Sequence, residues 1–226
     1  MPMFENMETI LAIETSSSRG SAALYSDGRL LDVREFTSDR SHNSVLFGPL
    51  GEILRKAPPL DLIVTGTGPG SYSGIRVGIA AGMGISLARN IPMLGLPSLC
   101  GIGEAYSQER YAIAGDARRG SWWYAEVTGG LLTTAPVVDS LEEISRLTAR
   151  WPGQIFTTDA VSPPFCRALP VLPRAEVLVA RANALSVESL TRLTAEPVEP
   201  LYLRAPFITV SKKQPLIAPA SASAEF

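Results

Sequence analysis

The stretch from Thr65 to Asn90, TGTGPGSYSGIRVGIAAGMGISLARN, constrains the fold more than any other part of this chain. It follows an apolar run at 62–64 that is typical of a buried strand, and it turns through a glycine-rich loop at 66–70. A long apolar segment with helical periodicity comes next. The stretch therefore predicts a strand, loop and helix unit around which the other elements are arranged.

Small residues recur at every fourth position of the predicted helix and form one stripe along it: Gly74, Gly78, Gly82 and Ser86. Each glycine inside a helix costs about 1 kcal/mol relative to alanine, so a close packing contact must offset the cost. That contact is either with the chain's own sheet or with another chain, because spacing alone does not decide which side faces inward. Arg76 and Arg89 interrupt the apolar segment, so a membrane span is not predicted.

The composition is that of a soluble globular protein with one large domain or two small ones. The chain has 226 residues, of which 46% are hydrophobic, and its net charge is −2. This charge disfavours direct RNA binding by the chain alone, because holding phosphates needs a concentration of Lys and Arg. The N-terminal residues lack the basic region of a signal peptide, which predicts a cytoplasmic protein with Cys100 and Cys166 as reduced thiols.

The small numbers of histidine and cysteine residues limit the kinds of metal site and catalytic site that the chain can form. The chain has one histidine, His42, so a metal site with two histidines is excluded, and its two distant cysteines do not form a zinc site. A Ser-His-Asp triad would need His42, and no serine has the Gly-x-Ser-x-Gly context of a nucleophile elbow. The sequence therefore predicts neither a metal site nor catalytic residues in this chain.

The first half of the chain predicts an α/β lobe with the order β-β-β-α-β-α-β. The predicted elements are strands at 10–13, 21–25 and 30–36, a helix at 44–56, a strand at 60–65, the glycine-rich helix, and a strand at 92–96. Asp27 and Gly28 predict a tight hairpin turn, and Pro49 predicts a kink or a late start of the first helix. Three meandering strands followed by two crossovers are typical of the ribonuclease H-like and actin-like ATPase folds.

The second half predicts a smaller α/β lobe. We expect helices at 99–106, 140–151 and 180–194, strands at 111–116, 122–127, 154–158 and 198–203, and an irregular segment at 163–174. The domains are then an N-terminal lobe at 1–100, a C-terminal lobe at 101–210 and a tail at 211–226. The tail is rich in Ala, Ser and Pro without periodicity, which predicts disorder.

Two loops face each other at one edge of the predicted sheet, one after the first strand and one after the fourth. Their backbone N–H groups and hydroxyls could hold a phosphate, and the candidate residues are Glu14, Thr15, Ser16, Gly68, Gly70 and Ser71. The first loop lacks the glycine that lets a phosphate approach closely. Both explanations stay open: a structural turn, or the remnant of a nucleotide site.

Several motifs together resemble the TsaB/YeaZ family over roughly residues 8–204: IETSSSRGSAAL, SHNSVLFGPLGEIL, TGTGPGSYSGIRVGIAAGMGISLA, GDARRGSWWYAEV and EPLYLR. The resemblance implies a two-lobed actin-like fold and no catalysis by the chain itself. It implies a subunit that binds and activates TsaD, the catalytic subunit for the N6-threonylcarbamoyladenosine (t6A) modification of tRNA. It also implies a homodimer when alone, a small ATPase of the TsaE type as a further partner, and contact with tRNA only through the complex.

The resemblance also implies where the partner binds, because family members form both kinds of dimer through two N-lobe helices. The expected interface residues are Leu46, Leu50, Ile53, Leu54, Gly74, Ile75, Gly78, Gly82 and Ser86. On this view Gly78→Leu weakens the heterodimer and leaves the fold largely intact. Asp116 and Arg118 match a family turn and are expected to form a structural ion pair, and Arg76 has a structural role.

The isolated chain is expected to hold no cofactor, with a nucleotide only at an interface of the complex. A different class of function stays open beside the accessory role. The paired loops are also compatible with a self-sufficient ATPase or small-molecule kinase of the same fold, which would bind nucleotide without a partner.

Overall fold

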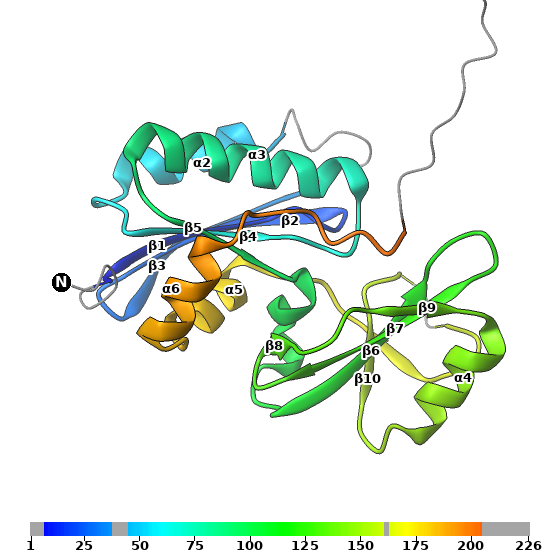
Figure 1. The fold of residues 1–226 in the computed structure, drawn as a ribbon. Coiled ribbons are helices and arrows are strands. Elements are labelled where there is room, and N and C mark those ends of the chain that lie inside the picture. The colour runs from blue at the N-terminus through cyan, green and yellow to red at the C-terminus, as the bar shows by residue number, and fades with distance from the viewer. Residues whose placement is uncertain (1–6, 38–44, 161–162, 205–226) are drawn as a thin grey trace, which may run out of the picture.

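The computed structural model describes residues 7–37, 45–160 and 163–204, and it contains two lobes, each built on its own β-sheet (Figure 1). His42 and the predicted tail at 211–226 lie outside the described residues. So does the start of the predicted helix at 44–56.

The five strands of the first sheet are β1 (Thr9–Glu14), β2 (Arg19–Ser26), β3 (Arg29–Thr37), β4 (Leu62–Gly66) and β5 (Met93–Leu96). They lie in the order β3-β2-β1-β4-β5, with the first three antiparallel and β1, β4 and β5 parallel. Asp27 and Gly28 connect β2 to β3 with positive φ angles of 51° and 77°, as a type I′ turn requires. The predicted hairpin is therefore confirmed.

Among the described residues, four helices cover the two faces of this sheet. Helices α2 (Phe47–Lys56) and α3 (Tyr72–Arg89) pack on one face, and α5 (Ala175–Asn183) and α6 (Val187–Ala195) pack on the other (Figure 1). The predicted order β-β-β-α-β-α-β is confirmed for the described residues. Helix α2 begins at Phe47, two residues before Pro49, so the proline lies in the first turn, where its missing N–H removes no intrahelical hydrogen bond.

The second sheet has the order β11-β10-β6-β7-β8, with β9 beside β7. Its strands are β6 (Arg110–Asp116), β7 (Trp122–Thr128), β8 (Leu131–Leu132), β9 (Val137–Asp139), β10 (Ile155–Thr157) and β11 (Ala168–Pro170). Helix α4 (Leu141–Arg150) packs on this sheet, and Ser140 caps it by accepting from the Glu143 backbone N–H. The strands predicted at 111–116, 122–127 and 154–158 and the helix predicted at 140–151 are confirmed.

Four predictions for the second half are wrong in detail. The segment predicted to be irregular at 163–174 contains the strand β11, which pairs with β10. The helix predicted at 99–106 is two short 3-10 helices, η1 (Ser98–Gly101) and η2 (Gly103–Ala105). The helix predicted at 180–194 is divided into α5 and α6, because Ser186 caps a new helix start. The strand predicted at 198–203 is absent, since Pro197 and Pro200 interrupt backbone pairing there.

The segment from 196 to 204 instead crosses the first lobe as an extended connection. The Leu201 N–H donates to Thr67 O at 2.8 Å, and Tyr202 stacks on Tyr72 with ring centroids 5.0 Å apart. This path brings residues near the end of the described chain to the start of α3. The predicted domain boundary near residue 100 stays a prediction; α5 and α6, which follow it in the sequence, pack on the first sheet.

Candidate functional site

The glycine stripe of α3 faces the chain's own sheet, so it does not form the predicted partner surface. A Cβ added at Gly74 or at Gly78 would overlap Thr15, and one at Gly82 would lie 2.6 Å from the Thr65 Cγ2 atom. The Thr15 hydroxyl also donates to Gly74 O at 2.8 Å. The absent side chains therefore allow α3 to approach β1 and β4 closely.

Most of the remaining predicted interface residues also have their contacts within the chain. Leu46, Ile53 and Ile75 are fully buried within the chain, and the Ser86 hydroxyl donates to Ile91 O at 2.6 Å. Only Leu50 and Leu54 line a surface hollow. The partner contact itself stays a prediction. The sequence did not show which side of α3 faces inward, because small residues lie on both sides.

The opposite side of α2 and α3 carries an apolar groove of about 540 Å³. We call it the α2–α3 groove, and it is lined by Phe47, Leu50, Gly51, Leu54, Ala80, Ala81, Gly84, Ile85, Ala88 and Arg89. A Cβ added at Gly51 or at Gly84 would meet nothing within 4 Å, so the floor is open. Exposed apolar side chains occur on the same helices, with Phe47 58% and Leu87 77% exposed.

Most of these groove residues were missed by the sequence reasoning. One signal could have found them: Gly84 lies off the inward stripe, and Ala80, Gly84 and Ala88 repeat at four-residue spacing beside it. A second stripe of small residues on one helix indicates two close contacts, one on each side. The sheet supplies the first contact, and the second is open among the described residues.

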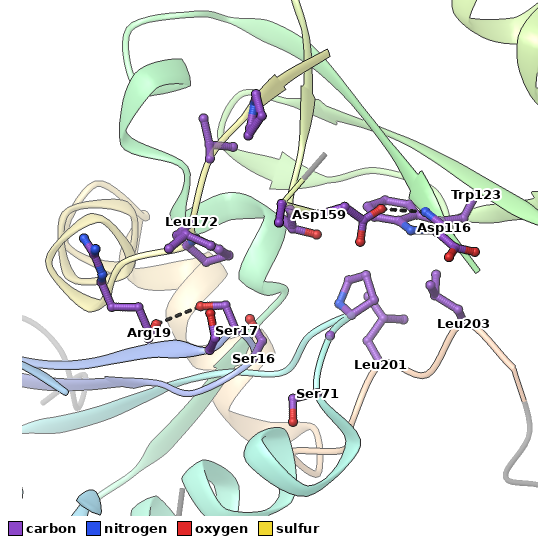
Figure 2. A pocket seen from close by; sticks show the side chains of 18 of the residues that line it. Ser16, Ser17, Arg19, Ser71, Asp116, Trp123, Asp159, Leu172, Leu201 and Leu203 are labelled. Carbon is purple, nitrogen blue, oxygen red and sulfur yellow. Dashed lines mark hydrogen bonds between the residues drawn. The ribbon is translucent and has the colours of Figure 1, made fainter. Parts of the chain in front are cut away.

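The two predicted facing loops do meet, at a cleft of about 890 Å³ between the lobes that both polar and apolar residues line (Figure 2). Ser16 and Ser71 line it from the first lobe, and Asp116, Arg118 and Asp159 line it from the second. The Ser71 N–H donates to Ser16 O at 2.7 Å, which joins the two loops directly.

Several backbone donors of the glycine loop already have partners inside the chain. The Thr67 N–H donates to Leu96 O at 2.8 Å and the Gly68 N–H to Ser98 Oγ at 2.9 Å, and in the first turn of α3 the Gly74 N–H donates to Ser71 Oγ at 3.2 Å. These N–H groups stabilise the loop and are not free to hold a phosphate. Among the described residues, the internal hydrogen bonds favour the structural explanation of the loop.

Glu14 lies directly behind the two loops and is fully buried. Its Oε1 atom accepts from the Ser16 N–H at 2.6 Å, while its Oε2 atom has no hydrogen-bond partner among the described residues. Burial raises the pKa of this carboxyl above its usual value, although hydrogen bonds from Ser16 and Ser98 oppose the shift. A buried acid at this position does not offer a hydrated carboxylate to a ligand.

The expected ion pair in the second lobe is present at the cleft. Arg118 Nη1 lies 3.2 Å from Asp116 Oδ2, and the Arg118 N–H donates to Asp116 Oδ1 at 2.6 Å. Figure 2 shows Asp159 beside Asp116, where the Asp159 Oδ2 accepts from the Asp116 N–H at 2.7 Å. Burial raises the pKa of Asp159, and the nearby Asp116 carboxylate adds to the shift.

Arg76 contacts Tyr72 at the start of α3, and its structural role stays a prediction. Its Nη1 donates to the Tyr72 hydroxyl at 2.8 Å, and its guanidinium lies 5.3 Å from the centre of that ring. Within the described ranges, no group of three or more histidine, cysteine, aspartate or glutamate side chains gathers as a metal site. None of the described helices is long and apolar enough to cross a bilayer.

The two lobes, the strand order of the first sheet and the facing loops define a protein of the actin-like, ribonuclease H-like class. A model of the family described as TsaD, tRNA N6-adenosine threonylcarbamoyltransferase, matches residues 38–162, which is more than half of the chain. The TsaB protein of Escherichia coli K12, described as a tRNA threonylcarbamoyladenosine biosynthesis protein, is 26% identical over 228 residues, 86% of this chain and 94% of the relative.

A relative with the same description from Haemophilus influenzae is 28% identical over 127 residues, which is 53% of each chain. The solved structure of YeaZ from Pseudomonas aeruginosa is 27% identical, covers 87% of this chain and all of that one, and superposes with a TM-score of 0.63. The chain belongs to the TsaB/YeaZ family, within the wider group that the TsaD model describes.

Proposed function

We propose that this chain takes part in the biosynthesis of t6A in tRNA as a non-catalytic subunit that binds and activates the TsaD catalytic subunit. The observation that carries the proposal is the open α2–α3 groove of a member of this family. The groove is apolar, and no described segment of the chain fills it. Burying such a surface against another protein gains free energy in proportion to the apolar area removed from water.

The shape of the groove supports a helix as the bound element. Gly51 on α2 and Ala80, Gly84 and Ala88 on α3 form a floor without large side chains. The floor lies on two helices, and large side chains of a third helix pack into such grooves between ridges. The partner's helix would therefore insert large apolar residues over Gly84.

The wider assembly follows from the same proposal. A small ATPase of the TsaE type joins the complex, the chain forms homodimers through the same helices when alone, and tRNA is contacted only through the complex. We place this function in the cytoplasm. The isolated chain holds no nucleotide, and any nucleotide lies at an interface of the complex.

The decisive experiment is reconstitution with one component left out. The catalytic subunit, the small ATPase, threonylcarbamoyl-adenylate and substrate tRNA are combined with and without this chain, and modified adenosine is measured. Product that requires the chain, with none made by the chain alone, supports the proposal. Equal product without the chain contradicts it.

A variant pair connects the reconstitution to the groove. Gly84→Leu fills the floor of the groove and is expected to lower product and affinity for the catalytic subunit by about a hundredfold. Gly48→Leu is the matched control, because Gly48 lies on α2, meets nothing within 4 Å and does not line the groove. Equal losses from both variants would contradict the assignment of the groove.

The alternative of a self-sufficient ATPase or kinase is addressed by titrating the isolated chain with ATP and ADP. The size of the cleft between the lobes is the one observation in its favour. Saturable binding at millimolar nucleotide would support the alternative, and we expect none, because the loop donors already bond within the chain.

A further inference from the structure

We propose that Arg89 makes the α2–α3 groove selective for a helix that carries a carboxylate, and so favours a different partner over a second copy of this chain. The inference rests on the proposed function, because it specifies the chemistry of the partner in the same groove. Of the described residues that line the groove, Arg89 alone is charged.

Arg89 lies in the last turn of α3 and is exposed. Among the described residues no carboxylate forms an ion pair with it, whereas Arg34, Arg110, Arg118, Arg146 and Arg174 all have acidic partners. A cation in the last turn interacts favourably with the helix dipole, by about 0.3 to 1 kcal/mol. That role explains a basic residue at this point of α3, but it does not require the residue to line an apolar groove.

The apolar part of the groove does not distinguish between partners. Its floor of small residues accepts large side chains from any helix with the right spacing. A second copy of this chain offers such side chains, since Met83 and Leu87 are 45% and 77% exposed and lie one helical turn apart on α3. Shape therefore fits both a second copy and a different protein.

Charge does distinguish between them. Neither α2 nor α3 has an acidic residue in its first turn, and their last turns carry Arg55, Lys56 and Arg89. A second copy packed antiparallel would bring a helix start without acid beside Arg89. A second copy packed in parallel would bring another basic last turn.

The one acid on these two helices has a partner already. Glu52 of α2 lies 3.6 Å from Arg34 of β3. In both orientations, self-association through α2 and α3 therefore covers Arg89 without giving it a carboxylate, which carries a desolvation cost. A partner helix with Asp or Glu at this end of the groove removes that cost and adds a charge-assisted hydrogen bond.

The test compares two charge reversals on the same helix in the full chain. Arg89→Glu places a carboxylate in the groove, and Arg76→Glu makes the same change near the start of α3, outside the groove. Affinity for the TsaD catalytic subunit is measured by calorimetry at low and high salt, and self-association is measured by sedimentation. Thermal unfolding of each variant checks that the fold is retained, and Arg89→Gln replaces Arg89→Glu if folding is impaired.

We expect Arg89→Glu to weaken the complex by about tenfold or more and to reverse its salt dependence, because the facing carboxylate becomes repulsive and salt screens that repulsion. Self-association should not weaken, and Arg76→Glu should change neither value by more than about twofold. Unchanged affinity for the catalytic subunit with Arg89→Glu, or equal losses of complex and homodimer, would overturn the inference.

The two proposals fail in different ways. If Gly84→Leu abolishes the complex but Arg89→Glu does not affect it, the groove is the interface and the selectivity inference is wrong. If the unmodified chain does not bind the catalytic subunit, the proposed function and the inference both fail.

Discussion

The two sides of helix α3 carry similar small residues and have opposite surroundings. On the inner side, side chains added at Gly74 and Gly78 would overlap Thr15, which directly follows β1, whereas on the outer side a side chain at Gly84 would meet nothing within 4 Å. The inner glycines are explained by packing that already exists. The outer stripe of Ala80, Gly84 and Ala88 is exposed among the described residues, and we propose that a partner helix covers it. A small residue in a helix therefore indicates a close neighbour, and the structure shows whether that neighbour belongs to the same chain.

The largest expected effect is that of Gly78→Leu, which corrects the expectation that this change leaves the fold intact. Its side chain would have to displace Thr15 from the contact between β1 and α3. Overpacking of this kind costs about 1 to 3 kcal/mol, and we expect the upper end because leucine adds three carbons beyond the Cβ that already overlaps the Thr15 side chain. Urea unfolding should show this loss or an unfolded chain, and stability close to that of the unmodified chain would contradict the assignment of the inner side.

Replacing Glu14 tests the buried region on which the inner side packs. Glu14→Ala removes an acceptor from the Ser16 N–H and leaves a cavity, which should lower the free energy of unfolding by about 2 kcal/mol. Glu14→Gln keeps the shape and an acceptor, so its loss at neutral pH should be smaller. Urea unfolding of the two variants beside the unmodified chain compares these losses.

The pH dependence of stability gives Glu14 a second readout. Burial raises its pKa in the folded chain above the ordinary value of 4.5, so the folded state retains the proton where the unfolded state has lost it. The contribution of this group is fully present below the ordinary pKa and is lost as the pH rises through the raised one. Glu14→Gln should remove that decline, and parallel pH profiles for both proteins would contradict a buried neutral acid.

The arrangement of the first lobe could be predicted because its signals are local. Alternating apolar runs, the Asp27 and Gly28 turn and the glycine loop each define one element, and the order of these elements limits the topology. The facing of α3 could not be predicted, since small residues lie on both of its sides. The return of α5 and α6 to the first sheet was not predicted either, because it depends on contacts between residues far apart in the sequence, such as the Ala175 N–H donating to Ser21 Oγ at 2.9 Å.

The parts of the candidate site that depend on local motifs were predicted, and the parts that depend on distant residues were not. The meeting of the two loops and the Asp116 to Arg118 ion pair depend on short motifs, and both are present. The use of the loop N–H groups depends on Leu96 at the end of β5 and on Ser98 of η1, which lie elsewhere in the sequence. A glycine-rich loop therefore predicts closely spaced backbone donors, but only the tertiary structure shows which of them remain free.

A smaller loss of stability is expected at Ser71, the N-cap residue directly before α3. The Ser71 hydroxyl accepts from the Gly74 N–H at 3.2 Å and so caps the helix. Ser71→Ala should lower the free energy of unfolding by about 1 kcal/mol, and Ser71→Asp should retain most of it, because aspartate is also a good N-cap. Equal losses in urea unfolding would mean that the hydroxyl does not act as a cap.

The smallest effect, with the opposite sign, is expected at Gly84 on the outer side. Gly84→Ala should raise the free energy of unfolding by up to about 1 kcal/mol, because alanine has the higher helix propensity and the new Cβ has open space. Gly78→Ala is the matched change on the inner side, where the same gain in propensity is outweighed by the overlap with Thr15. Both variants make the same glycine-to-alanine change on α3. Comparing their free energies of urea unfolding therefore separates the effect of the surroundings from the effect of helix propensity. If both changes stabilise the chain, the inner contact with Thr15 is not the reason for the inner glycine stripe; if both destabilise it, the groove over Gly84 is already filled by the chain itself.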